Sequence, residues 1–213
     1  MPNIADPILI VLLLTNFFIL GTANLRASIR AVALQGILLS ILPLQIESQA
    51  TIRLVLLVLV TMVIKGFLIP MMLLKALRDV HIRHEIEPYL GFVPSLLLCV
   101  AGTGLALLFS DHLPLAAADR GSMFVPASLA TLLAGFLVLT TRRKAISQVT
   151  GYLMLENGIY VFGLLLYQAM VVEVGILLDL LVGIFVMGIV LNHIQREFSS
   201  LDTERLSRLR EER

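Results

Sequence analysis

Charged residues are scarce in this sequence. Asp, Glu, Lys and Arg make up 15% of its 213 residues, whereas hydrophobic residues make up 58% and the mean hydropathy is +0.95. A soluble domain usually carries about 25% charged residues, so this composition excludes an ordinary soluble protein and indicates an integral membrane protein. The net charge of +1 gives no support for binding to nucleic acid.

Groups of residues that carry chemistry are also missing. Cys99 is the one cysteine, so a disulfide within the chain is excluded. We find no nucleophile motif, phosphate-binding loop, haem-ligand pair or iron–sulfur ligand cluster, and we predict no catalytic centre and no cofactor in this chain. His81 and His84 lie in a charged loop without a third histidine, a pattern more typical of solvated surface than of a metal site.

Long apolar runs dominate what is present. A bilayer core about 30 Å thick is crossed by about 20 apolar residues in a helix. The runs are continuously apolar and do not alternate with polar residues, which argues against barrel strands. They predict an all-α, polytopic membrane protein with seven transmembrane helices, at residues 7–24, 28–46, 52–77, 89–110, 124–141, 145–167 and 170–194.

The basic residues are distributed unevenly about these spans. Thirteen of the sixteen Lys and Arg residues fall on one side, Arg53 and Arg120 fall on the other, and Lys65 lies inside a span. Because basic loops are retained in the cytoplasm, we predict an external N-terminus and a cytoplasmic C-terminus. The first apolar run has no basic residues before it, so we expect a retained span and not a signal peptide.

A weak internal repeat relates the two halves at a shift of 117 residues. It predicts a three-helix unit at residues 1–88, a joining helix and external loop at 89–123, a parallel three-helix unit at 124–194 and a charged cytoplasmic tail at 195–213. Chance similarity between apolar segments is the alternative. The matched pairs are Arg26 and Arg143, Ile29 and Ile146, Val32 and Val149, Leu38 and Leu155, Gly66 and Gly183, and Leu74 and Leu191.

Ionisable residues inside the spans are the candidates for proton transfer. Glu156 and Asp179 lie near the centres of the last two spans, Lys65 lies centrally in the third, and Glu173 lies near the outer end of the seventh. Such residues are costly in lipid and usually face protein or water. A lysine at that depth gives up its proton or finds a carboxylate, which here could be Glu156, Asp179 or an acid of another subunit. The alternatives are snorkelling for Lys65, a solvated Glu173, and structural hydrogen bonds for the two central acids.

Further residues are predicted to support these groups. Gln148, Tyr152, Glu156 and Tyr160 recur every four residues and form one polar stripe on the sixth span. Pro70 is expected to interrupt the helix next to Lys65. Gly183 and Gly188 are expected to allow close approach of a neighbouring helix.

The segment RRKAISQVTGYLMLEN at residues 142–157, followed by Asp179 and Gly183, resembles the K-type membrane subunit of bacterial complex I. Gly151 and Asn157 match the family's pattern. The family's first acid position is Leu153, and Glu156 comes three residues later, displaced by about 60° around the helix. Asp179 falls on the second acid position.

Taken whole, the chain resembles hydrogenase-4 component E, a membrane subunit of group 4 [NiFe] hydrogenase complexes. This resemblance implies a non-catalytic subunit of the bacterial or archaeal cytoplasmic membrane that contributes to proton or sodium translocation. The implied partners are antiporter-like and anchor membrane subunits and a peripheral arm, which would hold the [NiFe] site and Fe–S clusters. The alternatives are a purely structural membrane-arm subunit and a subunit of a multi-component cation/proton antiporter.

Overall fold

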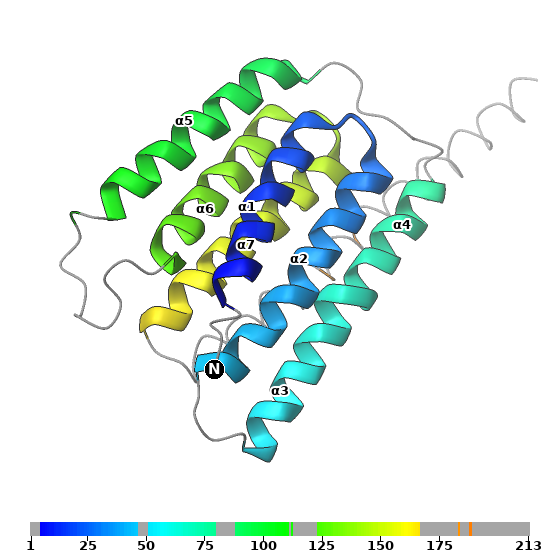
Figure 1. Cartoon of the computed structure of the whole chain (residues 1–213). Helices are drawn as coiled ribbons and strands as arrows, with labels where there is room; N and C mark the ends of the chain where they lie inside the picture. The colour runs from blue at the N-terminus through cyan, green and yellow to red at the C-terminus, as the bar shows by residue number, and fades with distance from the viewer. Residues whose placement is uncertain are drawn as a thin grey trace, which may run out of the picture.

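The computed structural model describes residues 5–46, 51–79, 88–110, 112, 123–166, 183 and 188. In this part of the chain the fold is all-α (Figure 1). Its helices are α1 (Ala5–Gly21), α2 (Leu25–Ile46), α3 (Ile52–Val63), the π-helical turn η1 (Ile64–Leu68), α4 (Ile69–Asp79), α5 (Phe92–Ser110), α6 (Phe124–Thr141) and α7 (Ala145–Leu166). Because α3, η1 and α4 follow one another without a break, they form one continuous helix.

The first six predicted spans are thus confirmed as helices, with ends that differ by a few residues. The seventh, at 170–194, lies outside the described residues except for Gly183 and Gly188, which are both helical. In the part of the chain that the structure describes, four helices are long and apolar enough to cross a membrane, namely Leu25–Gln45, Ile52–Arg78, Phe92–Ser110 and Phe124–Thr141. Helix α1 is a shorter apolar helix. Seven spans are therefore not established, but the chain has the helices of an integral membrane protein.

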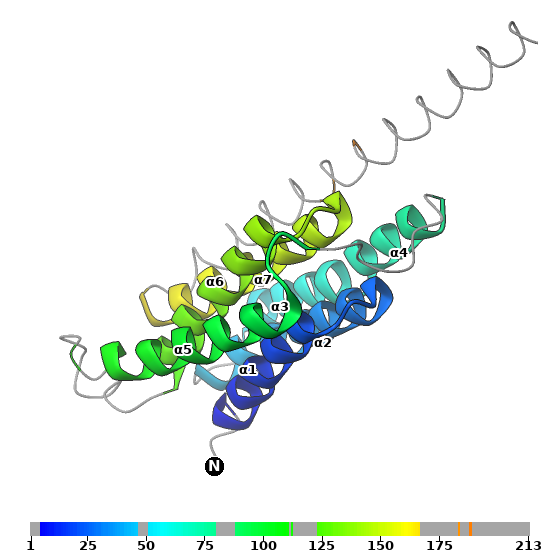
Figure 2. The same ribbon diagram turned by 90° about the horizontal axis from the view of Figure 1, so that it is seen from above.

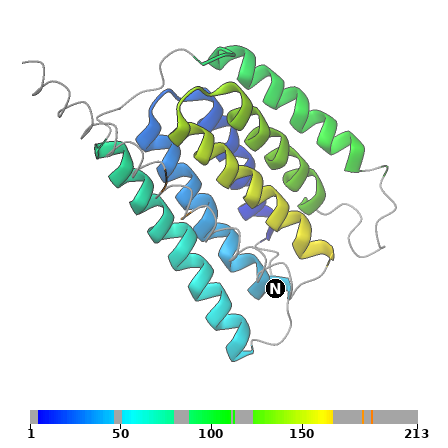
Figure 3. The same ribbon diagram turned by 180° about the vertical axis from the view of Figure 1, so that it is seen from behind.

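Helices α1, α2, α6 and α7 form the centre of the bundle. Helix α1 packs against α2 and α6, while α7 packs against α6 and α2. The continuous helix α3–η1–α4 lies outside against α2, and α5 lies on the opposite side against α1 and α6 (Figures 1 and 2). Seen from behind, α7 lies between α6 and α2 (Figure 3). Residues from α2 and from α7, far apart in sequence, therefore share one interior.

Tight backbone contact joins α6 to α7. A Cβ atom added to Gly151 would lie 2.5 Å from the Leu139 nitrogen, and one added to Gly158 would lie 2.7 Å from the Leu132 nitrogen. Gly135 faces α7 in the same way, against Leu155. Small residues let helices approach closely in a membrane, where packing and hydrogen bonds replace the hydrophobic effect as the force between helices.

Apolar side chains also cover the outside of the bundle. Most of the large apolar side chains that are exposed belong to α3, η1, α4 and α5, including Leu56, Phe67, Leu97 and Leu108. The interior holds polar residues such as Gln35 and Glu156. This arrangement suits a protein whose outer surface meets lipid or other membrane subunits.

The basic loops meet at one end of the bundle. The α1–α2 turn, the end of α4 and the α6–α7 turn all lie at the upper end in Figure 1, as the charge count requires. Two of the residue pairs matched in the predicted repeat lie in the same buried apolar cluster. They are Ile29 with Ile146 and Val32 with Val149. The repeat, the domain limits and the orientation in the membrane stay predictions.

Candidate functional site: a buried ion pair and its polar chain

Lys65 and Glu156 form an ion pair inside the bundle. Lys65 Nζ lies 2.5 Å from Glu156 Oε1, and the two side chains are 5% and 2% exposed. Nζ also donates to Asn157 Oδ1 at 3.3 Å and lies 5.5 Å from the centroid of the Tyr160 ring. Of the partners that the sequence left open for Lys65, the structure brings Glu156 to it. Snorkelling is excluded, because the ammonium points into the protein.

A π-helical turn and a glycine place Lys65. Lys65 lies in η1, whose end is marked by a hydrogen bond from the Ile69 N–H to the Ile64 carbonyl. Pro70 follows directly and cannot donate to the carbonyl one turn earlier. The helix interruption predicted at Pro70 therefore takes the form of a π turn in a helix that continues. Such turns occur frequently at functional sites.

Gly36 of α2 allows η1 to come this close. A Cβ atom at Gly36 would lie 2.7 Å from Lys65 Cβ, so any larger residue would push the two backbones apart. Gly66 does the same against the Ile37 side chain, at 2.5 Å. The two glycines let η1 pack closely against α2, and the Lys65 side chain then reaches Glu156 on α7.

The predicted polar stripe on α7 divides into two parts. Glu156 and Tyr160 are buried and reach Lys65. Near the start of the helix, Gln148 donates from Nε2 to the Arg142 carbonyl at 3.0 Å, and Tyr152 is half-buried against the apolar core. Gln148 is thus bonded to the α6–α7 turn, whereas Glu156 and Tyr160 lie at the ion pair.

Three residues that the sequence did not single out extend the site across the bundle. Asn157 Nδ2 donates to Gln35 Oε1 at 3.3 Å, Gln35 Nε2 donates to Asn16 Oδ1 at 2.9 Å, and Asn16 Nδ2 donates to Thr131 Oγ1 at 2.8 Å. Gln35 Nε2 also donates to Thr15 Oγ1 at 2.7 Å. The signal in the sequence was the presence of single amides within apolar runs, which are costly unless they are paired.

Two buried oxygen atoms near Lys65 have no hydrogen-bond partner among the described residues. They are Glu156 Oε2 and the hydroxyl oxygen of Thr61, which precedes Lys65 by four residues. Buried polar atoms are nearly always hydrogen-bonded, so each such atom requires an explanation such as a water molecule or an ion.

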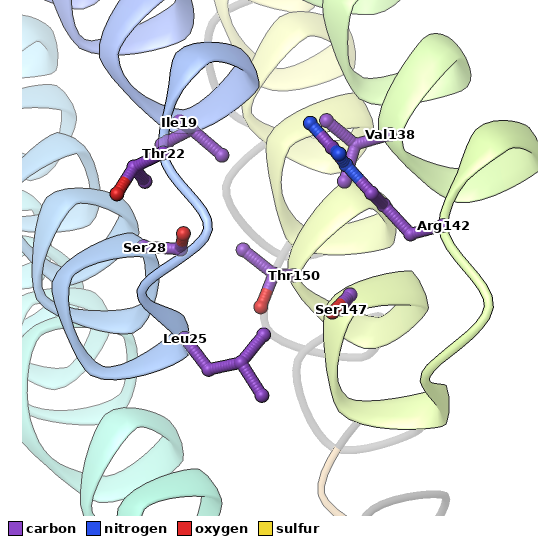
Figure 4. Close-up of a pocket in the computed structure, with 8 residues that line it drawn as sticks. All are labelled: Ile19, Thr22, Leu25, Ser28, Val138, Arg142, Ser147 and Thr150. Carbon is purple, nitrogen blue, oxygen red and sulfur yellow. The ribbon is translucent and has the colours of Figure 1, made fainter. Parts of the chain in front are cut away.

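A small polar cavity lies nearer the basic end of the bundle. Its volume is about 10 Å³, which is room for about one water molecule. Figure 4 shows the lining residues, which are Ile19, Thr22, Leu25, Ser28, Val138, Arg142, Ser147 and Thr150. Thr150 precedes Asn157 by seven residues, which is two helical turns or about 10 Å. Met154 and Leu153, both buried in the core, lie between them on α7, so this cavity is separate from the ion pair.

Arg142 is buried at the basic end of the bundle and connects three of its helices there. Although it belongs to a basic turn, it is only 3% exposed. Its Nη2 donates to the Leu20 carbonyl at 2.6 Å, and its guanidinium lies 4.4 Å from the centroid of the Phe92 ring. Arg142 therefore joins the α6–α7 turn to the end of α1 and the start of α5.

The remaining site predictions lie largely outside the described residues. Nothing is described of the side chains of Asp179 and Glu173. A Cβ atom added to Gly183 or Gly188 meets no atom of the described residues within 4 Å, and the predicted close helix approach there stays a prediction. Within the described ranges no group of three or more His, Cys, Asp or Glu side chains could hold a metal ion.

Comparison with known proteins finds relatives that match nearly the whole chain. It is 27% identical over 206 residues to hydrogenase-4 component E of Escherichia coli strain K12, and equally to that of Shigella flexneri, covering 93% of this chain and 94% of each relative. No family model and no solved structure matches it. It is also 30% identical over 206 residues to the uncharacterized protein Rv0085 of Mycobacterium tuberculosis, covering 94% of this chain and 93% of the relative. The chain therefore belongs to the same family as Rv0085.

Proposed function

We propose that this chain is a non-catalytic membrane subunit of a hydrogenase complex related to complex I. In that complex it would contribute to proton or sodium translocation coupled to electron transfer. The observation that carries the proposal is the Lys65–Glu156 pair, because a paired lysine and carboxylate buried in an apolar bundle are costly and mark ion paths in membrane proteins. The distant similarity to hydrogenase-4 component E supports the assignment to a hydrogenase complex.

The pair has the parts that a proton switch requires. While Lys65 lies against Glu156 Oε1, the ammonium stabilises the carboxylate. When Lys65 moves away, the buried carboxylate loses its counter-charge and takes up a proton, for which Oε2 is the free oxygen. In this proposal, redox chemistry elsewhere in the complex moves Lys65, and Glu156 gains and loses a proton as a result.

Asp179 and Glu173 extend this proposal along the neighbouring span. Asp179 would share one hydrated path with Glu156, and Glu173 would connect it toward the outer surface. The proposed setting is the cytoplasmic membrane of a bacterium or archaeon, with antiporter-like and anchor subunits and a peripheral arm as partners. The [NiFe] site and the Fe–S clusters belong to that arm and not to this chain.

The test compares translocation with electron transfer in the assembled complex. We expect Lys65→Met and Glu156→Gln to retain electron transfer to an artificial acceptor and to lose proton translocation measured in membrane vesicles. Gln148→Leu is the matched control, since Gln148 Nε2 donates to the Arg142 carbonyl in the α6–α7 turn, and this variant should translocate like the parent. If both site variants pump like the parent, the chain is a structural subunit. Co-purifying subunits without a [NiFe] protein would instead favour the cation/proton antiporter.

A further inference from the structure

One series of hydrogen bonds that starts at Lys65 keeps a single direction from donor to acceptor. Each residue accepts from the one before it and donates to the next, through Lys65, Asn157, Gln35, Asn16 and Thr131. The Thr131 hydroxyl then donates to the Ala127 carbonyl at 2.7 Å, which ends the series. The series starts in η1 and crosses α7, α2 and α1 before it ends in α6.

The two ends of the series fix this direction together. At the far end, the Thr131 hydroxyl gives its single proton to the Ala127 carbonyl and so accepts from Asn16. An ammonium group only donates, so Asn157 must turn its oxygen toward Nζ and its NH₂ group toward Gln35. Gln35 must then present its oxygen to Asn157 and its NH₂ group to Asn16, and Asn16 is fixed in the same way. Every amide along the series therefore has its oxygen on the side of Lys65.

All members of the series are buried. Gln35 and Thr131 are 0% exposed, Asn16 is 1% exposed and Asn157 is 2% exposed. Carboxamides hold their N–H protons, so these residues do not form a path for protons. Aligned dipoles in a buried, water-poor interior strengthen one another and stabilise the positive charge at which they point.

We propose that Asn157, Gln35, Asn16 and Thr131 are positioning residues that hold the Lys65 ammonium at Glu156. This set is named here the amide chain. Its role in ion movement rests on the proposed function, but its effect on Lys65 does not. In the amide chain, a change at Thr131 on α6 alters how strongly Lys65 is held, although Thr131 does not contact Lys65 in any described interaction.

The test is a double-mutant cycle on the purified full-length chain in lipid nanodiscs, read as the midpoint temperature of unfolding. Thr131→Val removes the hydroxyl at the far end of the amide chain, and Lys65→Met removes the charge at its start. We expect Thr131→Val to lower the midpoint in the parent and to lower it by less than half as much when Lys65 is already Met, because the charge no longer orders the amides. Thr131→Ser, which keeps the hydroxyl, should unfold like the parent.

Ser128→Ala is the matched control. Ser128 is 0% exposed on the same helix, and its hydroxyl donates to the Val125 carbonyl at 2.8 Å, outside the amide chain. Its shift should be the same with Lys65 and with Met at position 65. Equal shifts for Thr131→Val in both backgrounds, or a Thr131→Ser variant as unstable as Thr131→Val, would overturn the proposal.

The outcome is independent of the proposed function. A coupled cycle together with normal pumping by Lys65→Met would leave the amide chain in place and refute the transport role. Additive shifts together with lost pumping by Lys65→Met would refute the amide chain and support the transport role. If the amide chain and the transport role are both supported, Gln35→Leu in the assembled complex should reduce proton translocation while electron transfer continues.

Discussion

Gly36 of α2 lies directly against Lys65 of η1, where a single added Cβ atom would stand 2.7 Å from the Lys65 Cβ. The atoms it would meet include the Lys65 backbone carbonyl, at 3.3 Å, which cannot move as a flexible side chain can. The ion pair therefore depends on a residue that takes no part in its chemistry.

Gly36→Ala should destabilise the chain and move Lys65 away from Glu156. Overpacking of this kind costs about 1–3 kcal/mol of unfolding free energy. Gly104→Ala in α5 is the control, because an added Cβ atom there meets nothing within 4 Å. It should be neutral or stabilise by about 0.5–1 kcal/mol. Unfolding in denaturant measures both, and equal effects would contradict the close contact.

Removing one member of the ion pair should cost more than removing both. Lys65→Met leaves a buried carboxylate alone, and Glu156→Gln leaves a buried ammonium, each costing about 3–5 kcal/mol when no group compensates. The double variant leaves no uncompensated charge and should recover a large part of the loss. Unfolding free energies of the two single variants and the double variant give the coupling, and additive losses would mean that the two groups do not pair.

Arg142→Met should loosen the basic end of the bundle. It removes the hydrogen bond to the Leu20 carbonyl and the contact with the Phe92 ring. A hydrogen bond from a charged group contributes about 1.5–3 kcal/mol. Arg143→Met is the comparison, since Arg143 is exposed and lies 4.5 Å from the Tyr89 ring, where such a contact contributes about 0.5–1 kcal/mol. The Arg142 variant should have the lower unfolding midpoint.

Gly183→Ala separates packing within the chain from packing with partners. Among the described residues, an added Cβ atom at Gly183 meets nothing within 4 Å, whereas at Gly151 it would meet the Leu139 backbone. The isolated chain should therefore tolerate Gly183→Ala within about 0.5 kcal/mol, and Gly151→Ala should destabilise it. If Gly183 contacts another subunit, its variant should reduce the yield of co-purified complex. Unchanged yield would remove the predicted packing role.

The two ends of the chain should report opposite sides of the membrane. Thirteen basic residues on one side and two on the other predict an external N-terminus and a cytoplasmic C-terminus. Compartment-sensitive reporters fused to each end measure this directly. If both ends report the same compartment, the number of spans is even and the prediction of seven spans is wrong.

Hydropathy was sufficient to predict the helices, and residues 124–141 were predicted to form the helix that is observed as Phe124–Thr141. It could not choose among the acids that might pair with Lys65, because the choice depends on how closely η1 approaches α2 at Gly36. The π turn was not predicted either, since the response of a helix to Pro70 depends on the helices packed around it.

Of the amide chain, the sequence pointed only to Asn157, which lies next to Glu156. Gln35 and Asn157 are separated by 122 residues, and Asn16 and Thr131 by 115. Gln35, Asn16 and Thr131 belong to three different helices and form no periodic polar pattern that indicates a face. Their common function becomes visible only when α1, α2, α6 and α7 lie side by side.

The amide chain also limits rotation of the helices about their own axes. An apolar helix in hydrocarbon gains little by choosing one face over another, because leucine packs against lipid nearly as well as against leucine. Turning α2 by one residue position, about 100°, would carry Gln35 away from both Asn16 and Asn157 at once. Since four helices share this single series of hydrogen bonds, none can rotate without a penalty in the other three. The polar atoms thereby select one assembly from the many that an apolar bundle would allow.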